Sequence, residues 1–570
     1  MPPGLSILFD VKRSISFLPT ARVDMCEGNE SNHQLADKGS KKSNYQRAAC
    51  KRSKGGCQTC KRRRVKCDET HPRCLRCTKT RLHCEGYPTP VSKSTGRTTE
   101  LAILPRPEVV PNVTQLTTTQ PSALLLGETE VEHRYLRYFQ HETTSGFESA
   151  WDWTIWNRLV LQGVHHEDFI RQAVVAIGAL HKSLRTQSST GKGSVGDESD
   201  YMAKLHREFA YRTYGKALKN MQRAVDGNDG RAALLACLLV VCFESHTGNR
   251  YKALSHAKYG LQILHQWTDR LKSVEEEIVD AFKNLDIQIT TINDHRTPES
   301  HRELIAEDLP FVQSMPTQFG CLDEVKRYWS AIFRRSCHFL ATTWSRTESQ
   351  SLTREFCTEI PGSVTSLEKE QKQFGAELDR WLEAFHPIFT KIRQSDGVKG
   401  REYISVSVLR IQALTAKITL AGVVFTQEIL YDQFYTEFAE IISLSHDVAG
   451  VRHSNPKADF WTGSFLLDLG LNAPLFYLTL RCRDPMLRRE AIAILNSWHV
   501  ECWWDPLLVA SIGQFAMELE EGGMVDGLIP ETSRAILTAK CHCPPERSFL
   551  IQFVQRTEAG LKWTEGWIHW

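Results

Sequence analysis

The chain has 570 residues, of which 41% are apolar and 24% charged, and its formal net charge at pH 7 is only +3. This is the composition of an ordinary globular protein, and the length suggests more than one folded unit. The longest strongly apolar run, residues 232–243, is well short of the ~20 residues that a transmembrane helix needs, so we expect a buried helix there and no membrane span.

Residues 1–50 show no sustained apolar periodicity, and their polar stretch near residues 29–44 is rich in Asn, Ser and Lys. Such a segment cannot bury enough apolar surface to offset the conformational entropy lost on folding. We therefore predict a disordered, basic N-terminal tail.

The next segment, residues 51–90, contains six cysteines in the order C-x2-C-x6-C-x6-C-x2-C-x6-C, and we predict that it is a metal-binding module. The short C-x2-C loop lets two sulfurs of one chain reach the same zinc ion, and thiolates are preferred ligands of structural zinc. The predicted ligands are Cys57, Cys60, Cys67, Cys74, Cys77 and Cys84.

The number of ligands indicates that the two metal ions share some of the thiolates. Two four-coordinate Zn²⁺ ions have eight coordination positions, whereas the segment offers six thiols, so two thiolates must bridge. The first three cysteines recur seventeen residues later, and this internal symmetry selects Cys57 and Cys74 as the bridges. Val65 and Leu82 occupy equivalent positions in the two halves and are expected to pack across the pseudo-twofold axis. So small a segment should fold only with its metal.

Two other interpretations of the cysteines were weighed. His71 and His83 could complete eight ligands for two unbridged ions, but His83 directly precedes a ligand and His71 precedes Pro72, which restricts its backbone. Disulfides are also possible in principle. No secretory signal precedes the motif, however, and the remaining cysteines are scattered as in reduced compartments.

The charge of the chain is concentrated around these cysteines. Residues 38–84 hold 16 Lys or Arg and only two acids, giving +14, so the remainder of the chain carries about −11. A basic patch of this kind is typical of proteins that bind a polyanion. Between the second and third cysteines we expect a short helix, residues 58–65, to enter the DNA major groove. Its candidate DNA-binding residues are Lys61, Arg62, Arg63, Arg64 and Lys66. The same run also suits a nuclear localisation signal.

The segment from Cys57 to Cys67, with Cys74-Leu-Arg-Cys77 and Cys84 after it, resembles the fungal Zn2Cys6 binuclear cluster domain. Pro72 matches the loop proline that joins the two halves in that family. The resemblance implies two Zn²⁺ per chain, the same bridging pair, and recognition of CGG-type triplets in double-stranded DNA. It assigns base reading to Arg63 and Arg64, although many members carry Lys at the latter position.

Residues 91–123 are rich in Pro, Ser and Thr, which predicts an extended linker. Members of the family commonly dimerise through a coiled coil after the cluster. The prolines exclude heptads here, so we expect either a monomer or a homodimer formed through the C-terminal region.

Residues 124–570 have a helical period, and the predicted fold class is a small Zn2Cys6 module joined to a large all-α regulatory domain. Two apolar faces stand out: 169, 173, 174, 177 and 180, and then Tyr211, Tyr214, Leu218 and Met221. Further helices are expected over residues 251–267, 326–345, 366–393, 401–425, 433–449 and 485–498.

Phrases in this region resemble the fungal-specific transcription factor domain, notably Ala176-Ile-Gly-Ala-Leu-His181 and Cys482-Arg-Asp-Pro-Met-Leu-Arg-Arg-Glu-Ala491, with the likeness spread over residues 125–525. The resemblance implies a nuclear, sequence-specific transcription regulator of RNA polymerase II genes that works with the transcription machinery or co-regulators. The alternative function is a zinc-dependent protein- or RNA-interaction protein without sequence-specific DNA readout.

Catalysis is not expected, because no phosphate-binding glycine loop, nucleophile elbow or zinc protease motif is found. The best candidates for a hidden site have simpler explanations. His165 and His166 should be solvated between helices, Cys541 and Cys543 lack a second cysteine pair, and the tryptophans at 563, 567 and 570 are expected to be packing residues.

Overall fold

We describe the protein from a computed structural model. The described residues are 57–63, 65–80, 82–87, 129–144, 155–188, 196–226, 229–266, 274–292, 294, 296–347, 363–395, 400–454, 469–498, 503–538 and 548–570. The predicted tail and linker, Arg64, and Cys541 with Cys543 lie outside these ranges. The cysteine module and the helical region form two separate units, and each is described by itself.

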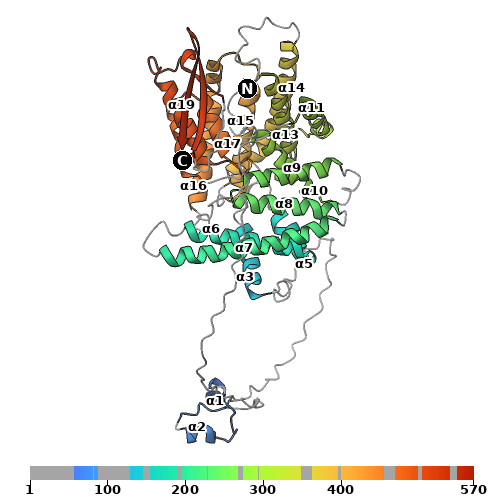
Figure 1. Cartoon of the computed structure of the whole chain (residues 1–570), viewed down its shortest axis with the longest axis vertical. Coiled ribbons are helices and arrows are strands. Elements are labelled where there is room, and N and C mark those ends of the chain that lie inside the picture. Colours follow the sequence, from blue (N-terminus) through green and yellow to red (C-terminus); the bar gives the residue numbers. More distant parts are fainter. Residues whose placement is uncertain are drawn as a thin grey trace, which may run out of the picture. The chain divides into compact units, whose positions relative to one another are not determined.

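The cysteine module repeats the same short turn twice. Helix α1 (Gln58–Arg62) begins after Cys57, and helix α2 (Leu75–Lys79) begins seventeen residues later after Cys74 (Figure 1). Helix α1 is shorter than the predicted 58–65. Equivalent backbone hydrogen bonds close the two turns, from Val65 N to Cys60 O and from Leu82 N to Cys77 O. The sequence repeat is therefore also a structural repeat.

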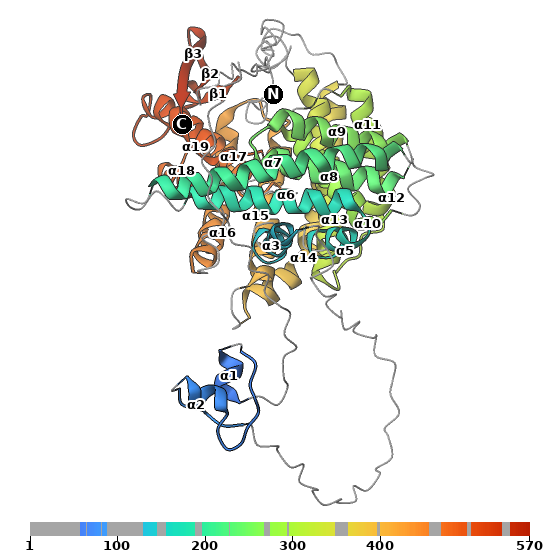
Figure 2. The ribbon, with the colours of Figure 1, turned by 60° about the horizontal axis from the view of Figure 1, so that its bottom comes forward.

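The first part of the second unit is built from helices, as predicted. Its elements are α3 (Glu130–Tyr138), the π-helical turns η3 (Phe139–Thr143) and η4 (Ile155–Leu159), α5 (Val160–His166), α6 (Asp168–Ser188), α7 (Gly196–Asp226), α8 (Gly230–His246), α9 (Arg250–Gln266), α10 (Glu276–Ile292), α11 (Pro298–Glu307) and α12 (Leu309–Gln313). Helices α6 and α7 lie side by side along much of their length (Figure 2).

The predicted apolar face of α6 is buried, whereas that of α7 is half wrong. Tyr211 is 49% exposed and Leu218 is 38% exposed, while Tyr214 and Met221 are buried. The buried stripe of α7 is rotated toward small residues, including Ala210 and fully buried alanines at 203 and 217. Small side chains allow two long helices to approach closely. The prediction followed the large apolar residues instead, and it therefore placed the buried face of α7 incorrectly.

The second part continues with helices that surround a central one. These elements are α13 (Leu322–Thr347), α14 (Ser363–Arg393), α15 (Arg401–Gly422), the 3₁₀ turn η7 (Glu428–Phe434), α16 (Tyr435–Ser454), α17 (Asn472–Arg481), α18 (Pro485–Ser497) and α19 (Pro506–Glu521). Helices α13, α14, α15, α16 and α18 agree with the predicted helices to within about five residues at each end, whereas α17, α19 and η7 were not predicted.

Helix α15 lies between two apolar cores. One side chain set, including Ile411 and Ile418, belongs to the larger core, and another, including Leu409 and Ala413, belongs to the smaller core around Trp329 and Trp381. By length and composition α15 could also cross a membrane, but 72% of its most apolar window is buried inside the protein. A helix that is apolar all round is expected where both faces are covered by protein.

The C-terminal end departs from the all-α prediction. Strands β1 (Ala535–Leu537), β2 (Ser548–Thr557) and β3 (Gly560–His569) form an antiparallel sheet in the order β1-β2-β3 (Figure 2). Phe549, Ile551 and Phe553 alternate on the buried face of β2, a period-two signal that the helical interpretation overlooked. The rest of the described second unit is helical, apart from its turns and loops.

The sheet also corrects the role given to the C-terminal tryptophans. Trp563 and Trp567 are 45% and 54% exposed on β3, so they are not core residues. Trp570 does pack against the core, and its indole N–H donates to Asp505 Oδ2 at 3.0 Å. On the buried side of β3, Gly566 lies so close to the Phe515 ring of α19 that a Cβ would come within 2.4 Å of it.

Candidate metal centre and nucleic-acid interface

The six predicted ligands lie in one buried cluster of the module. Four of their sulfurs form a compact set: Sγ of Cys57 lies 3.6 Å from Sγ of Cys74 and 3.9 Å from that of Cys77. Sγ of Cys60 lies 3.7 and 3.8 Å from the same two sulfurs. Cys67 and Cys84 complete the cluster.

These separations suit zinc. A tetrahedral ion with Zn–S bonds of about 2.3 Å requires neighbouring sulfurs about 3.8 Å apart. The cysteines are not joined by disulfides, and C-x2-C pairs at such separations are typical of structural zinc ligands. Because the donor set is all sulfur and tightly spaced, the residues present fit a thiolate-bound zinc site.

The first cysteine of each half also begins a helix. Cys60 N–H donates to Sγ of Cys57 at 3.4 Å, and Cys77 N–H donates to Sγ of Cys74 at 3.3 Å. The sulfur thus takes the place of the oxygen that usually accepts from a free N–H group in the first helical turn. This is the local reason for a helix to follow each C-x2-C start.

Backbone donors also act on the third cysteine of each half. Burial raises the pKa of Cys67, but N–H groups of Cys57 and Glu69 donate to its sulfur at 3.5 and 3.4 Å, and the net pKa is lowered to about 7. At Cys84, N–H groups of Cys74 and Gly86 outweigh burial and lower the pKa to about 7. Both thiols are therefore prepared to act as thiolates, the form that binds metal.

Two residues that the sequence analysis did not single out hold the module together. Thr59 on α1 donates through Oγ1 to the His83 carbonyl at 3.1 Å, and the same oxygen accepts the Glu85 N–H at 3.0 Å. The Asp68 carboxylate accepts the N–H groups of Leu75 and Arg76 at 2.9 and 2.7 Å. The local signals were a Thr inside the first C-x2-C and an Asp directly after the third cysteine.

Of the predicted packing pair Val65 and Leu82, only the first packs in the module. Val65 packs against the cysteine cluster, whereas Leu82 is 42% exposed and contributes no core across the pseudo-axis. The partner that the sequence missed is Tyr87, which also packs on the cluster and donates its hydroxyl to the Thr70 carbonyl at 2.9 Å.

Neither histidine of the rival interpretation joins the sulfurs. The His71 ring packs on Tyr87 with a centroid separation of 3.9 Å, and both His71 and His83 are exposed. The group of possible metal ligands found in the described part of the module contains cysteines alone.

The basic run presents its side chains to solvent. Lys61, Arg62, Arg63 and Lys66 are all exposed, at and after the end of α1. Arg62 forms an ion pair with Glu85, and Nη1 of Arg63 donates to Thr80 Oγ1 at 3.4 Å. Arg64, the fifth predicted contact, lies outside the described residues. Cations at the C-terminal end of a helix interact favourably with its dipole.

A second group of possible metal ligands, Asp294, His301 and His338, lies inside the helical unit. Its polar atoms already have partners: Asp294 is bound by Arg296, and Nε2 of His338 lies 3.1 Å from Asp286 Oδ2. Nδ1 of His301 lies 3.0 Å from Nδ1 of His338. This arrangement is that of a satisfied buried polar network.

The remaining candidates for catalysis were two histidines, two cysteines and the C-terminal tryptophans. His165 and His166 are exposed at the end of α5, as expected for solvated residues. Trp563 and Trp567 are exposed on β3, and Cys541 and Cys543 lie outside the described residues.

Comparison with known families agrees with the motifs. Residues 55–94 match the fungal Zn(2)-Cys(6) binuclear cluster domain, and residues 134–307 match the fungal specific transcription factor domain. The resemblance predicted from the sequence is therefore confirmed for these two segments. No curated protein and no solved structure matches the chain. Both families are transcription factor domains rather than enzyme domains, and the Zn2Cys6 match implies zinc binding.

Proposed function

We propose that this chain, which carries a fungal Zn2Cys6 cluster domain and a fungal specific transcription factor domain, is a sequence-specific transcription regulator of RNA polymerase II genes. The observation that carries the proposal is the arrangement of exposed cations directly beside the buried sulfur cluster. Lys61, Arg62 and Arg63 project from α1, the helix whose first turn is held by the Cys57 sulfur.

In the proposed mechanism the six thiolates would hold two Zn²⁺ ions, and Cys57 and Cys74 would be the ligands that the two ions share. When bound, the metal would supply folding free energy and fix the backbone of the module. The residues of the module then do the recognition. Lys61, Arg62 and Lys66 contact phosphates, whereas Arg63 and Arg64 read guanines of a CGG-type triplet, since arginine can donate two parallel hydrogen bonds to guanine O6 and N7.

The helical region would act on this recognition from elsewhere in the chain. We assign to it the binding of co-regulators or transcription machinery and, where a homodimer forms, the contact between copies. Residues 51–90, 91–123 and 124–570 would then serve as DNA-binding module, linker and regulatory domain, after the N-terminal tail of residues 1–50. Action on nuclear genes requires a nuclear location, which the basic run suits as an import signal.

The test compares full-length protein bound to a CGG-containing duplex and to a scrambled duplex over a series of salt concentrations. We expect Arg64→Ala and Arg63→Ala to cost about 1–3 kcal/mol on the CGG duplex and to reduce the preference for it. Lys66→Ala should weaken both duplexes similarly and reduce the salt slope by about one.

Arg327→Ala, which removes a half-exposed cation of α13 far along the chain, is the matched control and should change neither quantity. Equal affinity of the unmodified protein for both duplexes would contradict sequence-specific readout. Preference for RNA over both duplexes would favour the alternative function as an RNA-interaction protein.

A further inference from the structure

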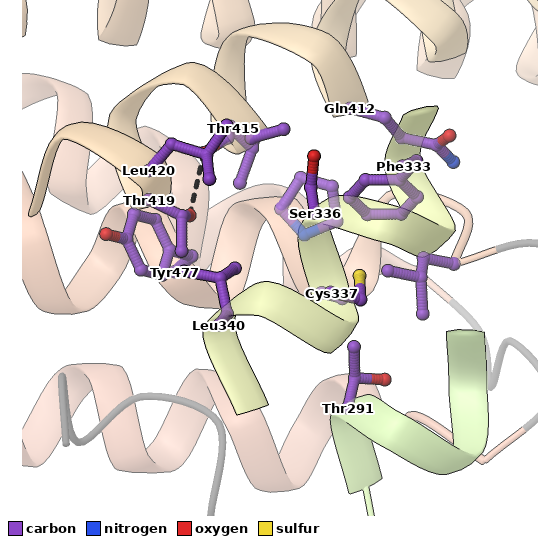
Figure 3. A pocket seen from close by; sticks show the side chains of 14 residues that line it. Thr291, Phe333, Ser336, Cys337, Leu340, Gln412, Thr415, Thr419, Leu420 and Tyr477 are labelled. Carbon is purple, nitrogen blue, oxygen red and sulfur yellow. Dashed lines mark hydrogen bonds between the residues drawn. The ribbon is translucent and has the colours of Figure 1, made fainter. Parts of the chain in front are cut away.

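A cavity lies where the two apolar cores of the helical unit meet. It is lined by side chains of α13, α15 and α17, with Thr291 from α10 and Leu469 from the segment before α17 (Figure 3). Its empty volume is about 570 Å³, part of which is open to solvent. Leu340 and Ala416 belong to the smaller core, whereas Ala473 and Tyr477 belong to the larger one. The enclosed part of the cavity is smaller than this empty volume, which limits an occupant to a small molecule.

The wall of this cavity contains no ionisable side chain that is charged at neutral pH. Its residues are aliphatic, aromatic, hydroxyl-bearing or amide, apart from Cys337. Burial raises the pKa of Cys337 and that of Tyr477, so both remain neutral. A charged ligand would lose its hydration here without gaining an opposite charge, which is unfavourable.

Four hydroxyl groups of residues in the wall are engaged within their own helices. Each donates its proton to a carbonyl of its own helix: Ser336 to Ile332 at 2.8 Å, Thr415 to Ile411 at 2.9 Å, and Thr419 to Thr415 at 2.7 Å. Thr291 does the same with Gln288 at 3.0 Å. A hydroxyl oxygen that has donated its proton keeps acceptor capacity. These four hydroxyl groups thus keep acceptor capacity and offer no free donor.

The amide of Gln412 is already engaged. Its oxygen accepts the Trp329 indole N–H at 3.1 Å, and its nitrogen lies 3.5 Å from the Gly470 carbonyl, which it can reach as a donor. Gln412 therefore fixes one side of the cavity by joining α13 to the segment that precedes α17. Its role is to make the wall rigid, and it does not provide a further group for binding a ligand.

We propose that this cavity is a binding site for a small, neutral molecule with an apolar body and at least one hydroxyl or N–H donor. The apolar body would occupy the space between Phe333, Leu340 and Leu420, and the donor would reach the oxygens of Ser336 and Thr415. Such a ligand fills a packing gap between the two cores and contacts both, so it stabilises the folded helical unit by mass action.

The site is placed to affect the C-terminal part of the unit. Tyr477 on its wall packs beside the Arg481 guanidinium, 6.0 Å from the ring centroid. Arg481 in turn binds Glu428 of η7 with both Nη1 contacts at 2.6 Å. A ligand that orders Tyr477 therefore acts on the buried ion pairs that join α17 to η7.

The experiment uses zinc-loaded full-length protein and three probes with the same apolar body: 4-ethylphenol, 4-ethylanisole and 4-ethylbenzoate. Isothermal titration should show one saturable site for 4-ethylphenol. The anisole, which lacks the donor, should bind about fivefold more weakly, the effect of one neutral hydrogen bond. The benzoate should bind more than about tenfold more weakly because its charge is desolvated.

Two kinds of variant locate the site. Ala416→Leu fills the cavity and should abolish binding of all three probes. The double change Ser336→Ala with Thr415→Val removes two acceptor oxygens and nearly keeps the volume of the side chains. The ratio of the affinities for 4-ethylphenol and 4-ethylanisole should then fall close to one. Thr436→Val, at an exposed threonine of α16 outside the cavity, is the matched control and should leave all three affinities unchanged.

The proposal is overturned if 4-ethylphenol shows no saturable binding, or if folded Ala416→Leu protein binds it as tightly as the unmodified chain. It is also overturned if the phenol preference is absent or survives the double change in full. Should Ala416→Leu fail to fold, as judged by circular dichroism, the change in preference of the double variant decides alone. None of these outcomes depends on DNA binding, so they test the cavity separately from the function proposed above.

Discussion

Cys57 and Cys74 each perform two tasks at the scale of single residues. Each sulfur is a proposed metal ligand in the central group of four, and each accepts the N–H group that starts a helix. The two tasks are compatible because a thiolate has several lone pairs and a backbone N–H group reaches a different one from the metal. Losing either cysteine therefore removes both a ligand and a helix start.

Cys74→Ala should lower the zinc content of the full-length protein from two ions per chain to one or none, because the proposed bridge serves both. Inductively coupled plasma mass spectrometry after extensive dialysis measures this. Cys242→Ala, at a buried cysteine of α8 outside the module, is the control and should keep both ions. Full zinc content in Cys74→Ala would exclude Cys74 as a bridging ligand.

Thr59→Val tests the two hydrogen bonds that join α1 to the end of the module. The variant keeps the shape of the side chain but leaves the His83 carbonyl and the Glu85 N–H without their partner, at a cost of about 1–3 kcal/mol. A chromophoric chelator should therefore remove the zinc from the variant at a lower concentration than from the unmodified protein. Unchanged zinc retention would mean that the two hydrogen bonds contribute nothing net.

His181 should make the helical unit less stable in mild acid. Burial, followed by the nearby His246 and Arg185, lowers its pKa to about 3, below the ~6.5 of an unfolded histidine. The unfolded chain therefore binds more protons between these values, so stability is fully present above pH 6.5 and is lost as the pH falls toward 3.

Urea unfolding followed by the helical circular dichroism signal at pH 7.5 and 5.5 measures this loss. His181 accounts for roughly 1 kcal/mol of it, since one pKa unit corresponds to about 1.4 kcal/mol. In His181→Gln the difference between the two pH values should shrink by that amount, with the contribution of the buried His246 remaining. An unchanged difference would contradict the assigned pKa.

At the scale of elements, buried ion pairs join helices that apolar packing alone would leave less specifically placed. Asp286 of α10 is fully buried, and its oxygens accept from Arg334 Nε on α13 at 2.8 Å and from Arg296 Nη1 at 2.6 Å. Glu520 of α19 similarly binds Arg483 at 2.9 Å and Arg488 of α18 at 2.7 Å. Each carboxylate lies where helices meet, and a charge buried there must be paired.

Asp286→Asn should lower the free energy of unfolding by about 3–5 kcal/mol, because it keeps the volume of the side chain but leaves the cations around it short of a buried counter-charge. The midpoint of chemical denaturation measures the change. Glu490→Gln removes an exposed pair with His446 instead, and should cost less than about 1 kcal/mol. A similar small shift for both variants would show that the buried network is energetically neutral.

At the scale of the whole molecule, the metal and the apolar cores stabilise different units. All six cluster cysteines lie between residues 57 and 84, while the helices of the second unit pack around two apolar cores. A strong chelator added to the full-length protein should therefore abolish preferential binding of the CGG duplex and leave most of the helical circular dichroism signal. Parallel loss of both signals would show that the helical unit also requires the metal.

The sequence predicted some features of this protein and missed others for a consistent reason. The spacing of six cysteines within one short segment was enough to find the sulfur cluster, because loop length alone limits which sulfurs can meet. Helix positions also followed from apolar period. In contrast, the period could not tell whether Tyr211 or Ala210 faces the core, since that depends on how closely α6 approaches α7.

The sequence by itself determined the cluster of six cysteines, the exposed basic run beside it and the helical character of the large region, all of which depend on residues close together along the chain. Only the tertiary structure decided the exposure of Trp567, the pairing of Asp286 with Arg334, and the cavity beside Tyr477. These features join segments tens of residues apart, and their energies come from burial and pairing that exist only once the helices and the sheet have packed together.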